Sequence, residues 1–215
     1  TVLVGFTGLS AGLYFVSKER NKAVISSNLA ARRLDEKRLA LDQMLATFGD
    51  DKLKGQPGSQ PVRKLFLEKG LAQYQSMLAE QTTEPAVVLR TGDALRELGL
   101  VTKELGEVDQ SLAHLQKAVD LCRSAVAARP QDPAMKAGLG DALHELAQAL
   151  FENQKYPEAL PLVTESVDIF RALLKADPAK VDYKAKLGRS VARRASLLTA
   201  AEERKPLYDE SVTLL

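Results

Sequence analysis

The apolar positions of the chain recur with a period of 48 residues. The segment Gly92-Asp93-Ala94-Leu95 returns as Gly140-Asp141-Ala142-Leu143, and Gly188 lies one further period along. Self-similarity at a fixed period of this length is typical of a solenoid, in which each unit buries its apolar face against its neighbours. The pattern therefore predicts an all-α fold of stacked, similar units.

Within each period, apolar residues at helical spacing alternate with breaks rich in proline and glycine, which predicts pairs of antiparallel helices. The segment 206–212 matches 161–167 at an offset of 45 rather than 48, and we assign the difference to a three-residue deletion in the third inter-helix turn. The expected helices cover about 62–80, 85–105, 108–128, 133–153 and 156–176, another after Pro178, and a last one entered near Lys205-Pro206 and ending at Leu215.

Six apolar residues occupy matching places in successive units and are therefore predicted to form the core. They are Leu98, Leu115, Leu146, Leu150, Leu160 and Val163. Small residues at Gly99, Ala147 and Ala195 are expected to let the two helices of a unit approach closely.

The N-terminal part of the chain has a different pattern. From Val2 to Val16 every residue is apolar, glycine or a small hydroxyl residue, and glycines are frequent in membrane helices. We interpret residues 1–17 as a truncated transmembrane helix rather than a signal peptide, because no small-residue cleavage site follows. Residues 18–48 read as a juxtamembrane stalk helix, 49–61 as a linker, and 62–215 as the repeat domain.

Composition excludes several classes of function. The chain carries 30 basic and 28 acidic residues, so no strong positive field favours nucleic acid. Protein kinase motifs are absent from the sequence, and no nucleophile and base stand in a recognisable pattern. The two histidines, His114 and His144, have no second His or Cys one helical turn away. We expect no catalytic residue, no metal site and no cofactor.

One unit contains Tyr156-Pro157-Glu158-Ala159-Leu160, preceded by Leu146-Ala147 and Leu150. This skeleton resembles a tetratricopeptide repeat. The resemblance implies a superhelical solenoid of antiparallel helix pairs that binds a protein or peptide. The ordinary repeat has about 34 residues, so these repeats are elongated. The extra residues add close to two turns to each helix and keep its apolar face on the core.

In that family the first helix of each unit lines the concave face, which implies the location of a binding groove. Basic side chains there would hold carboxylates, and Phe151 would act as an apolar anchor. A plain solvated helix face is the alternative. The predicted partner-binding residues are Asp93, Arg96, Lys103, His144, Gln148, Phe151 and Arg189.

The order of the segments suggests a wider resemblance. A membrane helix, a basic stalk containing KERNKAV, the stretch 41–78 and long repeats resemble the C-terminal half of membrane-anchored serine/threonine protein kinases of planctomycete-like bacteria. This implies a non-catalytic, extracytoplasmic repeat region that senses or recruits protein partners. Lys18, Arg20 and Lys22 instead favour a cytoplasmic side for the repeats, so both orientations stay open. A membrane-anchored assembly factor of an envelope complex, with no kinase, is the alternative function.

Overall fold

The computed structural model describes residues 58–79, 85–198 and 201–214, together with Gln56 and scattered positions between 20 and 43. The chain divides into two compact units, Thr1–Gln43 and Met44–Leu215. In the first unit the described positions are helical and exposed. The predicted transmembrane segment, 1–17, and most of the predicted linker, 49–61, lie outside the described residues. No helix within the described part is both long and apolar enough to cross a bilayer.

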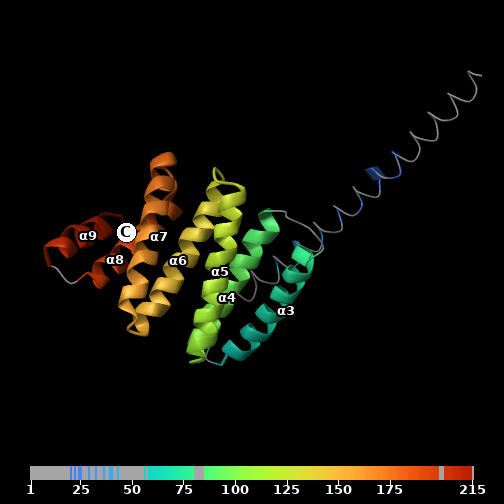
Figure 1. Ribbon diagram of the computed structural model, residues 1–215, viewed down its shortest axis with the longest axis horizontal. Coiled ribbons are helices and arrows are strands. Elements are labelled where there is room, and N and C mark those ends of the chain that lie inside the picture. Colours follow the sequence, from blue (N-terminus) through green and yellow to red (C-terminus); the bar gives the residue numbers. More distant parts are fainter. Residues whose placement is uncertain are drawn as a thin grey trace, which may run out of the picture. The chain divides into compact units, whose positions relative to one another are not determined.

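The second unit is a row of helices that pack in sequence order (Figure 1). Its described residues contain no strand, which confirms the predicted all-α architecture. The helices are α3 (Gln60–Ala79), α4 (Pro85–Glu104), α5 (Val108–Ala128), α6 (Pro133–Glu152), α7 (Tyr156–Ala176), α8 (Val181–Leu197) and α9 (Ala201–Leu214).

The helix boundaries repeat with the period of the sequence. α6 and α7 begin 48 residues after α4 and α5 respectively, and each pair has equal lengths. The turns within the pairs also match, since Gly106 and Gln154 occupy equivalent positions with φ of 79° and 61°. The amides of the next residues, Glu107 and Lys155, donate to carbonyls five residues back, as in a Schellman turn. Gly106 adopts this left-handed backbone without strain, whereas Gln154 does not.

The third pair departs from the prediction. α9 begins at Ala201, not near Lys205, and contains Pro206 at the place that Pro161 takes in α7. α8 has 17 residues and α6 has 20, while three residues separate the helices in both pairs. The three-residue deletion therefore shortens the end of α8 by almost one turn, and the prediction that it lies in the turn was wrong.

Local capping explains where the helices start. Asp132 accepts hydrogen bonds from the backbone amides of Ala134 and Met135, at 2.8 and 3.3 Å, and Pro133 takes the first helical position, where its missing N–H is not needed. α3 begins at Gln60, two residues before the predicted boundary, because the Ser59 carbonyl already accepts from the Arg63 amide at 2.9 Å.

Close contact between the two helices of each pair depends on small residues in the first helix. A Cβ atom built on Gly99 would lie 2.6 Å from Leu115 Cγ, and one on Gly140 would lie 2.7 Å from Phe170 Cε2. Ala147 is fully buried. This confirms the predicted role of the small residues, because larger side chains there would push the helices apart.

Five of the six predicted core residues are buried. Leu115 and Val163 are fully buried, and Leu98, Leu146 and Leu150 are at most 6% exposed. Leu160 was predicted wrongly, since it is only half-buried and lines a hollow on the outside of the helix row. It lies on the side of α7 that faces α5, where successive second helices leave a gap.

Leu146→Ala is expected to lower the free energy of unfolding by about 2–5 kcal/mol, because the leucine is 2% exposed and its removal leaves a cavity. Leu160→Ala deletes the same atoms from a half-buried position and should cost clearly less. Urea denaturation followed by circular dichroism measures both variants. Equal losses would show that the two leucines are packed alike, against the structure.

Candidate functional site

The first helices of the three pairs form one face of the row. α4 contacts α6 and α6 contacts α8, in addition to the contacts between helices adjacent in sequence. All seven predicted partner-binding residues belong to these three helices. The structure separates them into two groups of different charge, one between α4 and α6 and one between α6 and α8.

The group between α4 and α6 is neutralised internally. Arg96 Nη2 lies 3.0 Å from Glu97 Oε1. Burial alone would lower the pKa of the Arg96 guanidinium, but the carboxylates of Glu97, Asp93, Asp141 and Glu145 outweigh burial and raise it. Burial likewise raises the pKa of the Asp93 and Glu145 carboxyls, against the pull of Arg96. Arg96 is therefore committed to its neighbours.

The group between α6 and α8 is basic because the third unit reverses two charges. Residues four apart on a helix share a face, and two such positions repeat with the period of the chain. The first carries Asp93, Asp141 and Arg189 in successive units, and the second carries Glu97, Glu145 and Arg193. The inner face thus changes from acidic to basic toward the C-terminal end.

A cleft of about 360 Å³ opens in the basic group. It lies between α6, α8 and α9, and two of its residues were predicted on the binding face besides His144, namely Gln148 and Arg189. Its lining residues are His144, Gln148, Arg189, Ala192, Arg193, Ser196 and Tyr208. Guanidinium, imidazole, amide and hydroxyl groups therefore converge on one small space.

Phe151 stands at the edge of this group. Its ring is half-buried, with the Arg193 guanidinium carbon 4.3 Å from the ring centroid and the Tyr156 ring centroid 5.4 Å away. A guanidinium over an aromatic face is held by cation–π attraction. Arg193 is therefore oriented by Phe151, and Phe151 is an anchor for a protein side chain as well as a surface for a ligand.

Two other predicted residues are engaged with a common acid. Lys103 Nζ lies 3.3 Å from Glu152 Oε2, and the Gln148 amide donates to Glu152 Oε1. The Lys103 pair links α4 to α6 at the ends of these helices. Exposed pairs of this kind contribute little to stability, so either side chain can exchange its partner for a ligand at small cost.

His144 is the most perturbed group of the basic site. Burial, followed by the nearby charges of Arg189, Arg193 and Lys103, lowers the pKa of its imidazole to about 4. Its Nδ1 atom lies 3.1 Å from Ser190 Oγ on α8. His144 is therefore neutral at pH 7 and held in a fixed orientation.

Sequence reasoning did not include Arg193, Ser196 or Tyr208 among the predicted binding residues. The spacing of four from Arg189 was a usable signal for Arg193. Tyr208 gave no such signal, because it occupies the place of Leu115 and Val163 in the earlier units and so reads as core. It is 43% exposed instead and lines the cleft.

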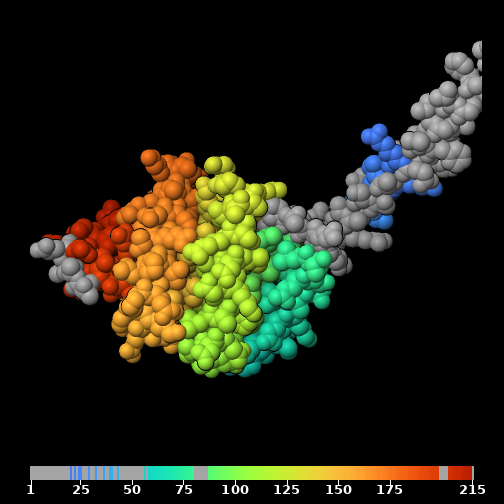
Figure 2. All heavy atoms as spheres, in the orientation of Figure 1, coloured from blue at the N-terminus to red at the C-terminus, as the bar shows by residue number. Residues whose placement is uncertain are grey.

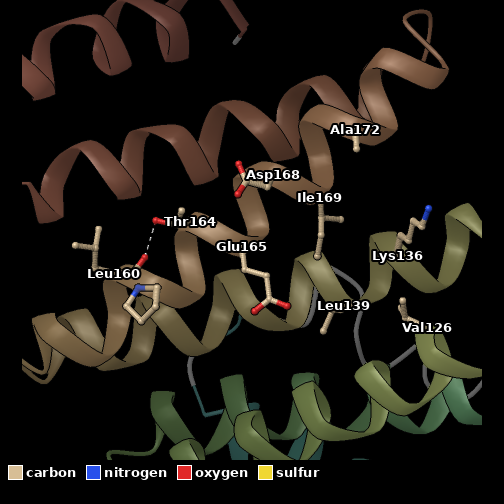
Figure 3. Close-up of a pocket in the computed structure, with 10 residues that line it drawn as sticks. Val126, Lys136, Leu139, Leu160, Thr164, Glu165, Asp168, Ile169 and Ala172 are labelled. Carbon is tan, nitrogen blue, oxygen red and sulfur yellow. Dashed lines mark hydrogen bonds between the residues drawn. The ribbon is translucent and has the colours of Figure 1, made fainter. Parts of the chain in front are cut away.

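A second, larger hollow of about 870 Å³ lies on the outer side of the row, between α5, α6 and α7 (Figure 3). Figure 3 shows Leu160, Ile169 and Ala172 along α7, with Val126 and Leu139 opposite. Thr164 Oγ1, at its rim, donates to the Leu160 carbonyl at 2.8 Å, within the same helix. The hollow is mostly apolar and lacks the convergent cations of the inner cleft.

Nothing in the described part of the chain points to catalysis. No group of three or more His, Cys, Asp or Glu residues there is placed to hold a metal ion. Burial raises the pKa of the Cys122 thiol to about 12, which keeps it protonated and unreactive. The site can therefore bind, through charge and hydrogen bonds, but offers no nucleophile.

Helix pairs with this packing and an inner face built from first helices are typical of tetratricopeptide repeats, and the sequence of the central unit agrees. Residues 139–179 match the tetratricopeptide repeat family. The match begins inside α6 and covers all of α7. It includes His144, Gln148 and Phe151 of the inner face. Tetratricopeptide repeats generally bind protein partners, and the chain is a helical-repeat scaffold of that type.

Solved structures of helical repeat proteins are similar over most of their length. The designed helical repeat protein DHR64 is 18% identical with a TM-score of 0.48, covering 84% of this chain and 95% of its own. BtubC (BKLC) from P. vanneervenii is 12% identical with a TM-score of 0.37, covering 86% and 90%. A Podospora anserina protein assigned as a kinesin light chain, with nearly identical TPR-like repeats, is 17% identical with a TM-score of 0.40, covering 85% and 94%.

With TM-scores below 0.5, none of these three structures bears on the function of this chain. A comparison with curated protein sequences finds no significant match.

The His144 imidazole should make stability depend on pH. Its pKa is about 4 in the folded chain and about 6.5 when unfolded, so the unfolded state binds more protons between these values. Stability is therefore lost as the pH falls from about 6.5 toward 4. The raised pKa values of Asp93 and Glu145 act in the opposite direction, which makes a comparison with a variant necessary.

His144→Gln should lose less stability than the wild type over this interval, as measured by urea denaturation at pH 7, 5.5 and 4.5. His114→Gln is the matched control, since the pKa of His114 is lowered less by a smaller degree of burial. A wild type and a His144→Gln variant with parallel pH profiles would contradict the assignment of a strongly lowered pKa.

Proposed function

We propose that the chain is a non-catalytic protein-interaction scaffold whose inner face binds an acidic peptide segment at the cleft between α6, α8 and α9. The repeat architecture and the match of residues 139–179 support a role in protein binding. The charges of the cleft support an acidic ligand, because guanidinium groups pair with carboxylates in a fork geometry.

The observation that carries this proposal is the excess of positive charge at Arg189 and Arg193. Neither guanidinium forms an ion pair with a described residue, and Arg193 Nε is buried without a hydrogen-bond partner. The arginines on the outer side behave differently. Arg123 pairs with Glu165, and Arg171 binds Glu210 through two nitrogens. Only the inner arginines therefore have donors left for a ligand among these residues.

The shape of the cleft supports a short segment rather than a folded partner. A volume of about 360 Å³ is at the lower end of ordinary ligand pockets and holds a few side chains. Phe151 and Tyr208 provide aromatic surface beside the cations. An extended peptide with a carboxylate next to an apolar side chain fits this combination.

The cellular setting is a separate part of the proposal and rests on the sequence alone. Residues 1–17 as a membrane anchor, repeats on the extracytoplasmic side and a serine/threonine kinase upstream form one setting. An anchored assembly factor of an envelope complex without a kinase forms the other. The repeats bind a protein partner in both, so the inner cleft serves either one.

Arg189→Gln/Arg193→Gln should weaken binding to acidic peptides by about tenfold or more, because charge-assisted hydrogen bonds are each worth about 1.5–3 kcal/mol. An array of acidic peptides with free carboxyl termini is the probe, read by fluorescence polarisation. The matched control is Arg123→Gln/Arg129→Gln, which removes the same charge from exposed positions of the outer side. Peptides that bind the site variant as tightly as the wild type would place the site elsewhere.

The two settings predict different reading frames. The kinase setting predicts a glycine-rich loop and a catalytic loop with its aspartate upstream of Thr1 in the complete gene. Sequencing the complete reading frame decides between them. An upstream region without these motifs would eliminate the kinase setting and leave the assembly factor.

A further inference from the structure

A chain of hydrogen bonds runs from the interior of the helix row to the inner cleft. Ser166 Oγ on α7 donates to the Gly140 carbonyl on α6 at 2.8 Å. Ser166 Oγ also lies 3.1 Å from Ser190 Oγ on α8, which in turn lies 3.1 Å from His144 Nδ1. Both serines are at most 1% exposed, so water does not compete for these bonds.

The order of the protons in this chain follows from one fixed end. A carbonyl oxygen only accepts, so the single hydroxyl proton of Ser166 is used on Gly140. The Ser190 hydroxyl must then donate to Ser166 Oγ. With its own proton used, Ser190 can only accept from His144. The Nδ1 atom of His144 therefore carries the proton, an assignment that comes from the network of hydrogen bonds.

The protonation state of the second ring nitrogen follows. The groups around the ring are cations from three helices, Arg189 and Arg193 of α8, Lys103 of α4 and none from α7 that shifts its pKa, and they oppose a second proton. His144 lines the cleft, and its Nε2 atom has no hydrogen-bond partner among the described residues. The neutral ring thus presents an acceptor at Nε2, beside two guanidinium groups that only donate.

We propose that His144 is a specificity-determining hydrogen-bond acceptor, held in one tautomer by Ser190 and Ser166, which selects ligands that carry an N–H donor next to a carboxylate. The carboxylate pairs with Arg189 and Arg193, and the neighbouring N–H donates to His144 Nε2. This inference rests on the proposed function, since it names the ligand chemistry of the same cleft. The shared chemistry is an acylated amino acid, either the last residue of a peptide or an internal aspartate.

Small probes separate the two parts of this recognition. N-acetylglycine has a carboxylate and an adjacent N–H, and N-acetylsarcosine has the same carboxylate with the N–H replaced by N–CH₃. Wild-type protein should bind N-acetylglycine about threefold to tenfold more tightly, the value of one hydrogen bond. Affinities come from titrations followed by chemical shifts of the cleft residues. N-acetylaspartate N-methylamide, a mimic of an internal aspartate, identifies the source by its affinity relative to N-acetylglycine.

Variants show which residue causes the preference. His144→Phe should remove the preference between the two glycine probes, whereas Arg189→Gln should weaken both probes equally. Ser190→Ala should reduce the preference through the tautomer and leave the affinity for N-acetylsarcosine unchanged. Imidazole ¹⁵N chemical shifts read the tautomer directly, and they should report Nδ1–H for the wild type at pH 7 and a mixture for Ser190→Ala.

The outcomes distinguish the inference from the proposed function. Equal affinity of the two glycine probes for the wild type would overturn the inference alone, as would ¹⁵N shifts that report Nε2–H. No shift of the cleft residues with any probe at its highest soluble concentration would overturn both the inference and the proposed site. Inorganic phosphate that binds more tightly than N-acetylglycine would overturn the assignment to a carboxylate.

Discussion

The structure depends on the close approach of the two helices in each pair at small residues of the first helix. Gly92 and Gly140 are one period apart, and a Cβ atom on either would come within 2.8 Å of Cys122 Sγ or of the Phe170 ring, which are also one period apart. The second helix can therefore vary in side-chain size while the first helix keeps glycine. This contact fixes the distance within a pair, and the first helices then pack on one another along the inner face. The outer helices remain splayed, which leaves the apolar hollow beside Leu160. The space-filling view shows the pairs in contact along the row (Figure 2).

The same period that allows stacking creates an electrostatic problem. Equivalent residues of neighbouring units lie close together, so an acid repeated in each unit meets its own copy, and Asp141 contributes to the raised pKa of Asp93. Arg96 lies among the carboxylates of the first interface and compensates them. At the second interface Lys186 Nζ bonds to Asp141 at 2.8 Å. The third unit replaces its acids by Arg189 and Arg193, and its inner face is left with cations that have no described acid to neutralise them. A ligand carboxylate supplies what the sequence of this unit omits.

Much of the fold followed from the sequence because period and punctuation act locally. Pro85, Pro133 and Gly106 mark helix ends by backbone geometry alone, and the predicted helices agree with the structure to within a few residues. The start of α9 could not be found this way, because Pro206 reads as a helix start but lies inside the helix. Pairings between side chains on different helices were also out of reach. The commitment of Arg96 to Glu97 and the link from His144 to Ser190 both depend on rotations of helices that no periodicity specifies.

The cleft lies where the repeat is least regular, and the irregularities act together. Losing three residues shortens α8. Tyr replaces the Leu115 and Val163 of earlier units at position 208 and lines the cleft. Two acids become Arg189 and Arg193 in the same unit. A solenoid gains stability from each unit that obeys its pattern, so three departures in one unit work against folding unless they serve something else. Departures from local rules that converge on one place are expected at functional sites. Here they bring an aromatic ring, two guanidinium groups and a histidine of fixed tautomer around a single space, and that arrangement has a chemical use only when a ligand fills it.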